Sequence, residues 1–360
     1  MTNQLPHADV AVVGGGVIGL AVAWRARRRG LEVVVAEREA EVGRGASYAA
    51  AGMLAPVGEA DPQERALLAH NLESARRWSS FAAELEDVTG VGVGYRTCGA
   101  LLVARDRDEA EHVEREREQR ERLGLRVERL LGSEARRREP ALAPGVRLAL
   151  ELPDDHAVEP ALVVAALAEA CRRAGVQIVT GREELNPRSL PHERVVLATG
   201  AWSGAPVRPV KGQALRLRDP AGPGLCDHVL RFEGGYLVPR GDGRYYLGAT
   251  MEEQGFDTSV TALGVYELLR EAAEVIPGVL ELEIEESFAG LRPGTPDNAP
   301  IVGTDPADER LVWATGHFRN GILLTPLTAE LVADELTGGR PDHALRPERF
   351  GVAATEGATT

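Results

Sequence analysis

The sequence has few cysteines, and their placement excludes two common kinds of site. The 360 residues include three, Cys98, Cys171 and Cys226, which are too few and too scattered for a disulfide framework or a metal site. We interpret them as small buried hydrophobic residues and expect no bound metal. Lysine is scarcer still, because Lys211 is the only one among 41 basic residues.

The sequence also lacks a long apolar run and an excess of positive charge. No run approaches the roughly 20 apolar residues that span a bilayer, and residues 1–9 lack the charged-then-apolar layout of a signal peptide. The formal net charge is −14, which argues against nucleic acid or an anionic membrane as a partner. We therefore expect a cytoplasmic protein.

What the sequence does contain, close to its start, is the pattern of a strand, a turn, a helix and a second strand. The apolar run at 8–13 ends on a glycine cluster, and a helical pattern follows as far as Gly30. A second apolar run at 31–36 then ends on Glu37. This order is typical of a βαβ unit.

The glycines of this unit have the spacing G-x-G-x-x-G, at Gly14, Gly16 and Gly19. We expect the first to make a tight turn, the second to let backbone approach a pyrophosphate, and the third to let helix and strand pack closely. The diphosphate would bind at the unpaired N–H groups of the helix start, and Glu37 would take both hydroxyls of a ribose. An acid there favours an unphosphorylated ribose, so the unit predicts FAD or NAD rather than NADP.

The remaining periodicity predicts an alternation of helices and strands. Helices are expected at 63–86, 106–122, 159–174, 261–275 and 322–336, and strands at 100–104, 176–179, 194–200, 236–240, 245–250, 284–289 and 311–315. Both ends of the chain have the character of a nucleotide-binding domain, and the strand-rich middle has that of a substrate domain. We therefore predict an α/β fold, in which a Rossmann-type dinucleotide-binding domain has an α+β substrate domain, built on an antiparallel sheet, threaded through it.

Two later stretches favour flavin over nicotinamide. Residues 195–200 resemble the strand, ending Ala-Thr-Gly, with which many FAD oxidoreductases complete their dinucleotide domain, and the loop 316–321 with its helix resembles the segment that covers the isoalloxazine. The N–H groups of Gly321, Ile322 and Leu323, at a helix start, can face the flavin N1/C2=O edge and stabilise the charge that develops there on reduction. No second G-x-G-x-x-G is present, which argues against a separate NADPH domain.

These features set the expected domain boundaries. We assign 1–85, 140–210 and 300–350 to a discontinuous FAD-binding domain, 86–139 and 211–299 to the substrate domain, and 351–360 to a flexible tail.

Taken together, these motifs resemble the D-amino-acid oxidase superfamily of FAD-dependent amine oxidoreductases, and within it the glycine oxidases of thiamine biosynthesis. The resemblance covers nearly the whole chain and implies non-covalent FAD and a homo-oligomer, either a dimer or a tetramer. Six stretches carry it in the family order: AAAGML at 49–54, PVKGQ at 209–213, YLVPR at 236–240, GATM at 248–251, GLRPGT at 290–295 and GHFRNGIL at 316–323.

The resemblance implies four substrate-binding residues. Arg292 would hold the substrate carboxylate as a two-pronged guanidinium–carboxylate pair, and the alternative is an ordinary surface arginine. Tyr236 would add its hydroxyl to the same carboxylate, or else only pack its ring in a strand. Met251 would form part of an apolar wall near the substrate α-carbon, or belong to the core. Arg319 would lie beside flavin and substrate in the covering loop.

The same resemblance, added to the βαβ unit, implies a set of residues around FAD. They are Gly14, Gly15, Gly16, Val17, Ile18, Gly19, Glu37, Arg38, Arg44, Ala46, Ser47, Ala51, Gly52, Met53, Thr199, Gly200, Trp202, His317, Arg319, Asn320, Gly321, Ile322 and Leu323.

The implied reaction is oxidative deamination of glycine and other small amino acids or amines. It needs no catalytic acid or base when the amine is neutral, because the α-hydrogen leaves as hydride to flavin N5 while the nitrogen lone pair forms the imine. O2 is then reduced to H2O2, and the imine is hydrolysed or enters thiazole synthesis. His317 could act as a base, but its place in the loop suits a structural role better.

Other readings of the same fold remain open from the sequence. Pocket volume decides between a glycine oxidase, a D-amino-acid dehydrogenase and a sarcosine or proline oxidase. One methylene changes the discrimination between two substrates by only about 1–3 kcal/mol, so the sequence does not separate these enzymes. A non-catalytic flavin-binding subunit or tRNA-modifying accessory protein would leave Arg292 unused.

Three positions depart from the family pattern or stay ambiguous. The stretch after Val179 is short, so that Glu184 falls about where an apolar residue would contact adenine, and the connection 202–208 is also short. Lys211 either activates oxygen or, as the simpler interpretation, pairs with a carboxylate.

Overall fold

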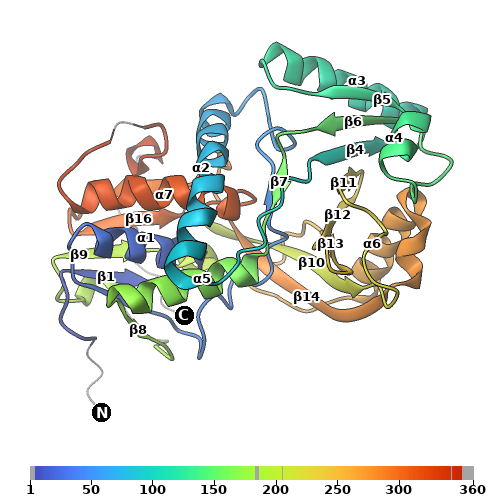
Figure 1. The fold of residues 1–360 in the computed structure, drawn as a ribbon. Helices are drawn as coiled ribbons and strands as arrows, with labels where there is room; N and C mark the ends of the chain where they lie inside the picture. Colours follow the sequence, from blue (N-terminus) through green and yellow to red (C-terminus); the bar gives the residue numbers. More distant parts are fainter. Residues whose placement is uncertain (1–4, 183–185, 205, 342, 351–360) are drawn as a thin grey trace.

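The computed structural model describes residues 5–182, 186–204, 206–341 and 343–350. Glu184, for which we predict a doubtful adenine contact, and the predicted tail at 351–360 lie outside the described residues. The described chain forms two lobes, each built on its own large sheet (Figure 1). No helix in this part of the chain is long and apolar enough to cross a membrane.

The first lobe is a six-stranded sheet with helices packed on it. Neighbouring strands pair in parallel except for the edge pair β15–β16. The strand order is β15 (Ile301–Thr304), β16 (Leu311–Thr315), β9 (Arg194–Leu197), β1 (Val10–Val13), β2 (Val33–Ala36) and β8 (Gln177–Val179). The helices are α1 (Val17–Arg28), α2 (Arg65–Thr89), α5 (Pro160–Ala174) and α7 (Gly321–Leu336). Strands from both ends of the sequence thus meet in one sheet, which confirms the Rossmann-type domain.

The central strands of this sheet are apolar throughout because both of their faces are covered. All four residues of β1 and all four of β2 are buried. Helices α1, α5 and α7 bury their own apolar residues, Leu20, Leu167 and Leu323 among them, in the same core. This burial explains why β1 and β2 lack the alternation of a half-exposed strand.

The second lobe is an eight-stranded sheet with helices on both faces. All neighbouring pairs for which a register is given are antiparallel, apart from β11 and β4, which run in parallel. The order is β14 (Glu283–Gly294), β10 (Arg208–Arg218), β13 (Arg244–Gly248), β12 (Gly235–Pro239), β11 (Val229–Phe232), β4 (Ala100–Ala104), β6 (Leu148–Leu152) and β5 (Glu128–Leu131). Its helices are α3 (Arg107–Arg122), α4 (Gly132–Arg138) and α6 (Ala262–Val275).

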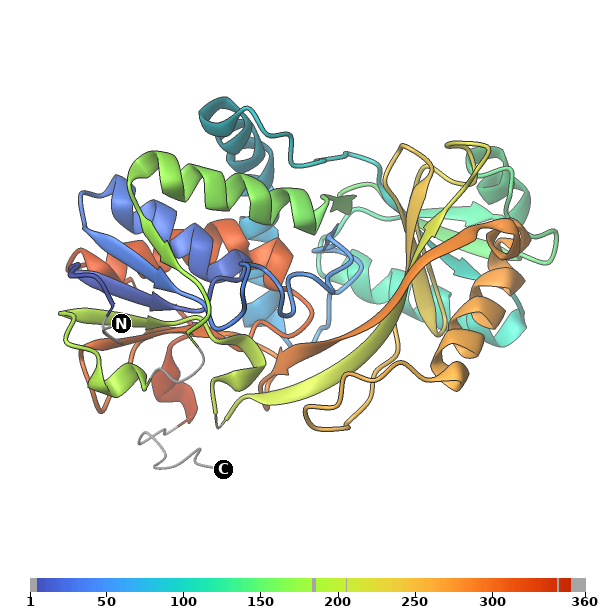
Figure 2. The ribbon, with the colours of Figure 1, turned by 90° about the horizontal axis from the view of Figure 1, so that it is seen from below.

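Successive side chains of β10 pack into two different hydrophobic cores, one on each face of the sheet. Leu215 and Leu217 pack with Leu268 of α6 on one face, whereas Ala214 packs with Val113 of α3 in the cluster on the other face. Successive strand residues point to opposite faces, so a single strand contributes to both cores. Strands β10 and β14 pair along their whole length and form a long twisted ribbon that reaches the first lobe (Figure 2).

A third, small sheet and four short 3₁₀ segments complete the described structure. Strands β3 (Met53–Leu54) and β7 (His156–Ala157) pair in the small sheet. The 3₁₀ segments are η1 (Pro187–Ser189), η2 (Gly200–Trp202), η3 (Pro277–Glu281) and η4 (Pro347–Phe350).

The local predictions agree with these elements, and one domain boundary does not. The expected helices and strands all occur within a few residues of their predicted ends, although β14 continues to Gly294. We assigned 140–210 to the FAD-binding domain, but β6 at Leu148–Leu152 pairs with β4 and β5 in the eight-stranded sheet. Its partners come from 100–104 and 128–131, and short apolar strands carry no local signal of which sheet they join.

Candidate active site

A cavity of about 1730 Å³ is lined by residues from both lobes. Small-molecule sites usually enclose roughly 300–1,000 Å³, so this one has room for a long ligand together with a second, small one. Its lining includes the start of α1, the end of β2, the small-residue run near 50, the start of α7, and parts of β10, β12 and β14. The predicted FAD and substrate residues therefore converge on one space, with the exceptions given below.

The glycine turn at the start of α1 has the geometry that its spacing predicts. Gly14 has φ +111°, and a Cβ there would lie 2.3 Å from the carbonyl oxygen of Ala198. A Cβ on Gly19 would lie 1.9 Å from the carbonyl oxygen of Gly14, so only glycine allows this close approach of helix and strand. Gly16 lines the cavity, where its missing side chain exposes the backbone to a ligand.

The first turn of α1 is capped by a side chain that is 30 residues away in the sequence. No side chain next to the helix caps it, but Ser47 Oγ accepts a 3.0 Å hydrogen bond from the N–H of Val17. Ser47 is buried and also lines the cavity, so its hydroxyl can donate its own hydrogen to an anion. Helix dipole, free N–H groups and this hydroxyl together suit a diphosphate.

Glu37 and two neighbours form a second part of the cavity wall. The Glu37 carboxylate accepts hydrogen bonds from the N–H of Gly15 at 2.6 Å and from the N–H of Glu39 at 3.0 Å. The guanidinium of Arg38 lies 3.6 Å from the centre of the Trp202 ring. Glu37, Arg38 and Trp202 all line the cavity, close to the glycine turn, where a ribose would follow the diphosphate.

The run of small residues from Ala46 to Met53 lets two segments approach the cavity closely. A Cβ on Gly52, which has φ +81°, would lie 2.1 Å from the carbonyl oxygen of Val158. Tyr246 fixes the run from the other side, because its hydroxyl donates a 2.7 Å hydrogen bond to the carbonyl of Ala49. Four members of the run that line the cavity, Ala49 to Gly52, present little more than backbone and methyl groups, which leaves room for a flat ring system.

The start of α7 brings backbone N–H groups to the same cavity. Gly321 and Ile322 line it, whereas Leu323 is buried behind them and its carbonyl accepts hydrogen bonds from Ser74 and Trp78. His317 lines the cavity as well and shares a 2.9 Å hydrogen bond with the hydroxyl of Thr328. Burial lowers the pKa of His317 to about 3, so its imidazole is neutral at physiological pH.

Arg292 projects from β14 into the cavity and is held by two backbone carbonyls. Its Nη1 donates to Lys211 O at 3.3 Å and to Thr250 O at 3.1 Å. Among the residues that the structure describes, Nε and Nη2 have no hydrogen-bond partner, which leaves one edge of the fork for a carboxylate. A Cβ on Gly212 would lie 2.3 Å from Nη1, so the glycine of the PVKGQ stretch makes room for the guanidinium.

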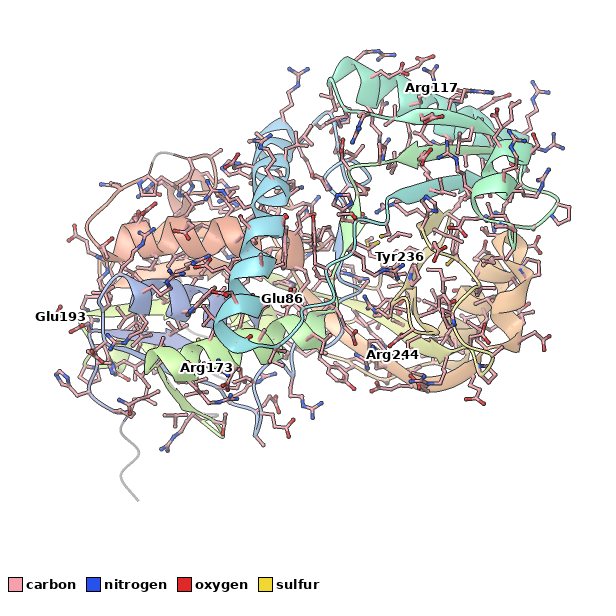
Figure 3. The ribbon with its side chains drawn as sticks, in the orientation of Figure 1. Glu86, Arg117, Arg173, Glu193, Tyr236 and Arg244 are labelled. Carbon is pink, nitrogen blue, oxygen red and sulfur yellow. The ribbon has the colours of Figure 1, made fainter. Side chains whose placement is uncertain are left out.

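Tyr236 and Met251 line the same cavity as Arg292 in different ways. Tyr236 lies on β12 (Figure 3), and its ring stacks on Tyr246 with centroids 6.1 Å apart and planes at 11°. Met251 is 59% exposed, so it is no part of the core, and its role as an apolar wall stays a prediction.

Arg319 is paired with a carboxylate that the sequence analysis did not single out. Its Nη2 lies 2.8 Å from Glu59 Oε2, and Arg231 Nη2 lies 2.6 Å from Glu59 Oε1. Burial alone would raise the pKa of Glu59, but the two guanidinium groups lower it to about 2. All three side chains line the cavity. Glu59 lies 172 residues from Arg231 and 260 from Arg319 in the chain, which is why no local pattern indicated these two pairs.

Four predicted FAD residues do not line the cavity. Gly15 and Gly19 act within the glycine turn, and Leu323 lies behind the start of α7. Arg44 pairs with Glu41 and is about half-exposed, so its place among the FAD residues is not supported. Lys211 also points away from the cavity, which favours its interpretation as a partner of carboxylates.

The lining contributed by α3, α6 and their neighbours carries mainly acidic side chains, a feature that the sequence analysis missed. It comprises Asp106, Asp108, Glu109, Glu116, Glu233, Glu267 and Glu271, with Arg105, His112 and Arg270 between them. Such a lining attracts cationic or zwitterionic molecules more than anionic ones.

Comparisons with known proteins agree with the geometry. A family model for FAD-dependent oxidoreductases (DAO) matches residues 9–335. The chain is 36% identical to the bifunctional protein ThiO/ThiG of Synechocystis sp. over 369 residues, 95% of this chain but 54% of that protein. It therefore spans about half the length of the bifunctional relatives that it matches.

Two further matches cover nearly all of the relative. The chain is 36% identical to a glycine oxidase of Geobacillus kaustophilus over 349 residues, which is 91% of this chain and 92% of that protein. The crystal structure of glycine oxidase from Geobacillus kaustophilus superposes with a TM-score of 0.88 at 34% identity, over 94% of this chain and 97% of that chain.

Proposed function

This chain belongs to the DAO family of FAD-dependent oxidoreductases, and we propose that it oxidises glycine and other small amino acids or amines. In this proposal the products are an imine and H2O2. The geometry of Arg292 is the observation that carries the proposal. Its guanidinium has one free edge and lines the same cavity as the proposed FAD residues, which suits a substrate carboxylate.

The residues around the cavity fit FAD in chemistry and in space. Gly16 and the start of α1, with Ser47, would hold the diphosphate, and Glu37 would hold the ribose. The small residues 49–52 leave room for a flat ring, and a Cβ at Gly14 or Gly52 would lie too close to a backbone carbonyl for either position to admit a side chain. We propose that the cofactor is bound without a covalent link.

In the proposed mechanism FAD, when bound, would supply the hydride acceptor and the route for two electrons to O2. The protein's own task is orientation and electrostatics. Arg292 holds the carboxylate, and Tyr236 adds a hydroxyl to the same end. The N–H groups of Gly321 and Ile322, at the start of α7, would stabilise negative charge that develops on the reduced flavin. The substrate loses a hydride from its α-carbon and a proton from its nitrogen as the C=N bond forms. Water then hydrolyses the imine to ammonia and an oxo acid.

No protein base is assigned to this reaction. His317 lines the cavity, but its pKa of about 3 and its hydrogen bond to Thr328 suit a structural role. The substrate therefore has to react as the neutral amine, and its proton can leave to solvent.

A substrate panel tests the proposal directly. Purified protein should be yellow, and it should release H2O2 with glycine, sarcosine, D-alanine or D-proline at rates that rank the pocket's preference. Turnover with a dye and not with O2 would indicate a dehydrogenase instead. A preparation that binds no flavin, or an Arg292→Ala variant with unchanged turnover, would contradict the proposal.

We extend the proposal to the fate of the product and the state of the protein. Relatives named ThiO/ThiG join a domain like this one to a second one, which supports delivery of the imine to thiazole assembly in thiamine biosynthesis. A homo-oligomer in the cytoplasm is proposed from the family resemblance, and light scattering at the mass of one 38.6 kDa chain would contradict the oligomer.

A further inference from the structure

Lys211, the only lysine of the chain, is buried beside the substrate anchor and faces away from the cavity. Its side chain is 1% exposed, although most lysines remain in solvent. It lies on β10 directly before Gly212, the residue whose missing side chain makes room for Arg292. A buried cation at this place requires partners, and those that the described residues supply all come from one neighbouring segment.

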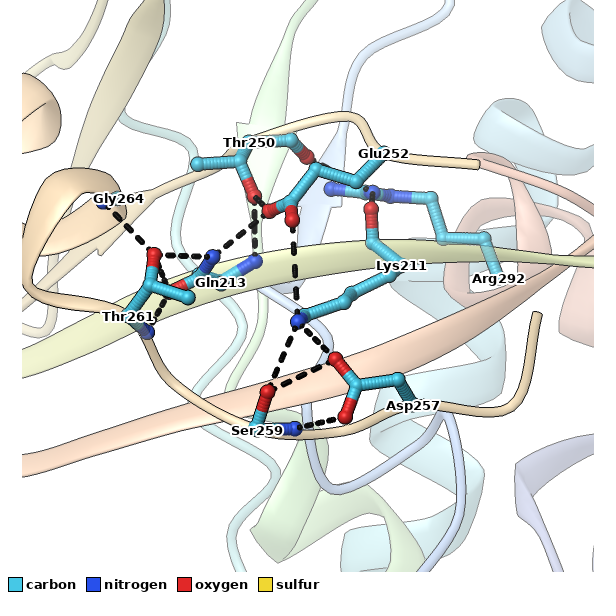
Figure 4. Close-up of polar contacts among 9 residues, drawn as sticks. All are labelled: Lys211, Gln213, Thr250, Glu252, Asp257, Ser259, Thr261, Gly264 and Arg292. Atoms are coloured by element: carbon cyan, nitrogen blue, oxygen red, sulfur yellow. Dashed lines mark hydrogen bonds and ion pairs between the residues drawn. The ribbon is translucent and has the colours of Figure 1, made fainter. Parts of the chain in front are cut away.

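That segment is 249–261, which connects β13 with α6 (Figure 4). Lys211 Nζ lies 2.5 Å from Asp257 Oδ2, 3.5 Å from Ser259 Oγ and 3.7 Å from Glu252 Oε2. The pKa of Asp257 is lowered to about 2, chiefly by its hydrogen bond to Lys211. The amine thus holds three points along a loop that has almost no regular structure.

Gln213, two residues further along β10, holds the two ends of the same segment. Its Nε2 donates to Glu252 Oε1 at 2.8 Å, and its Oε1 accepts from the N–H of Thr261 at 2.8 Å. Between these ends, residues 253–259 are exposed, and Phe256 stacks on Trp202 of the first lobe with centroids 5.5 Å apart. The middle of the segment is therefore held by Lys211, by this aromatic contact and by an exposed ion pair between Glu253 and Arg208.

The opposite side of the segment belongs to the substrate end of the cavity. Thr250, Met251 and Glu252 line it, and Arg292 Nη1 donates to the carbonyl of Thr250 as well as to the carbonyl of Lys211. The backbone of Lys211 also pairs with that of Glu252 through two hydrogen bonds of 2.9 and 3.0 Å. A shift of the segment would move one of the two carbonyls that orient the guanidinium.

We infer that Lys211 is a positioning residue for substrate binding, which holds segment 249–261 through Asp257 and Glu252 and so fixes the orientation of Arg292. The inference rests on the proposed function for the identity of the ligand, a small carboxylate, but not for the position of the segment. Asp257 does not line the cavity, and loss of its negative charge would by itself favour a bound anion. Weaker carboxylate binding without Asp257 would therefore act through Lys211 and the segment.

The test compares four variants of the FAD-loaded protein. Lys211→Met removes the charge at similar length, Asp257→Asn removes its main partner, and a third variant combines the two. Glu253→Gln is the matched control, because Glu253 is an exposed carboxylate of the same segment that pairs with Arg208 instead. Two readouts are measured: hydrogen exchange of 249–261, and the Kd of acetate from its perturbation of the flavin absorption spectrum.

We expect Lys211→Met to weaken acetate binding at least about fivefold and to raise hydrogen exchange in 249–261, since a small displacement of an orienting group has large effects. Asp257→Asn should do the same to a smaller extent, the double variant should match Lys211→Met, and Glu253→Gln should match the wild type. For glycine turnover, KM should rise more than kcat falls.

The outcomes separate this inference from the proposed function. Unchanged exchange and unchanged acetate affinity in Lys211→Met would overturn the positioning role, and so would additive effects in the double variant. If Lys211→Met does not fold, Asp257→Asn alone decides, because Asp257 is half-exposed and its removal leaves the core intact. If Lys211→Met raises hydrogen exchange in 249–261 but the wild type binds no acetate, the role of Lys211 in holding the segment is supported and the proposed function is contradicted.

Discussion

The Glu37 carboxylate accepts a 2.6 Å hydrogen bond from the backbone N–H of Gly15, across the 22 residues of the βαβ unit. The acid at the end of β2 therefore holds the glycine turn at the end of β1, in addition to lining the cavity. One residue thus couples the shape of the turn to the place where a ribose would bind.

This relationship predicts a loss of FAD affinity when the acid is removed. Glu37→Ala should weaken FAD binding about 10- to 100-fold, because hydrogen bonds to a charged group are each worth about 1.5–3 kcal/mol. Fluorescence titration of the apoprotein with FAD measures the Kd. Glu41→Gln is the control, since Glu41 is exposed and pairs with Arg44 outside the cavity. Equal affinity in Glu37→Ala would contradict the assignment.

The anchor role of Arg292 predicts that a lysine cannot replace it. Arg292→Lys keeps the charge but loses the fork that binds carbonyls and a carboxylate together, so KM for glycine should rise about 10- to 100-fold with a smaller change in kcat. Steady-state H2O2 release gives both constants. Arg218→Lys, at a surface arginine that pairs with Glu285, should leave them unchanged. A KM within twofold of the wild type would show that Arg292 does not bind substrate.

Glu59, Arg231 and Arg319 form a cluster of charges whose members should contribute unequally to the unfolding free energy. Glu59→Gln leaves the guanidinium of Arg231 buried without its main counter-charge and should cost about 3–5 kcal/mol in unfolding free energy. Arg319→Met removes a group that is 37% exposed and should cost about 1 kcal/mol or less. Urea unfolding in excess FAD measures both. Equal losses would mean that Arg231 does not depend on Glu59.

The pKa of Glu59 sets the pH range of that effect. The folded-state pKa of about 2 lies below the ordinary value of 4.5, so the carboxylate stabilises the fold above pH 4.5 and less as pH falls toward 2. The difference in unfolding free energy between wild type and Glu59→Gln should therefore shrink as pH falls from 4.5 toward 2.

His317 predicts a pH dependence of the same sign, but in a higher pH range. Its folded-state pKa of about 3 lies below the ordinary 6.5, so the unfolded chain takes up a proton first and stability falls as pH drops from 6.5 toward 3. The slope from this one group is about 1.4 kcal/mol per pH unit. His317→Gln should lose less unfolding free energy than the wild type between pH 7 and 5, whereas His7→Gln, at an exposed histidine, should not differ from it. Parallel losses in wild type and His317→Gln would contradict the neutral buried imidazole.

The sequence predicted those parts of the site whose residues are close together in the chain. The turn at Gly14 to Gly19, the acid at Glu37 and the loop that leads into α7 each follow from a short pattern, and each lines or shapes the cavity. The family resemblance added Arg292 and Tyr236, which also line it. Arg44 was included on the same basis, although its guanidinium pairs with Glu41 at the surface.

Contacts between distant segments were decided only by the tertiary structure. Strand β6 joined the second sheet through pairing with β4 and β5, Glu59 met Arg231 and Arg319, and Lys211 met segment 249–261. The residues next to a position in the sequence determine its backbone conformation and the periodicity of burial. Helices, strands and the glycine turn can therefore be predicted from the sequence. Which carboxylate reaches which guanidinium depends on sheet order and register, which arise from packing of the whole chain and leave no local pattern.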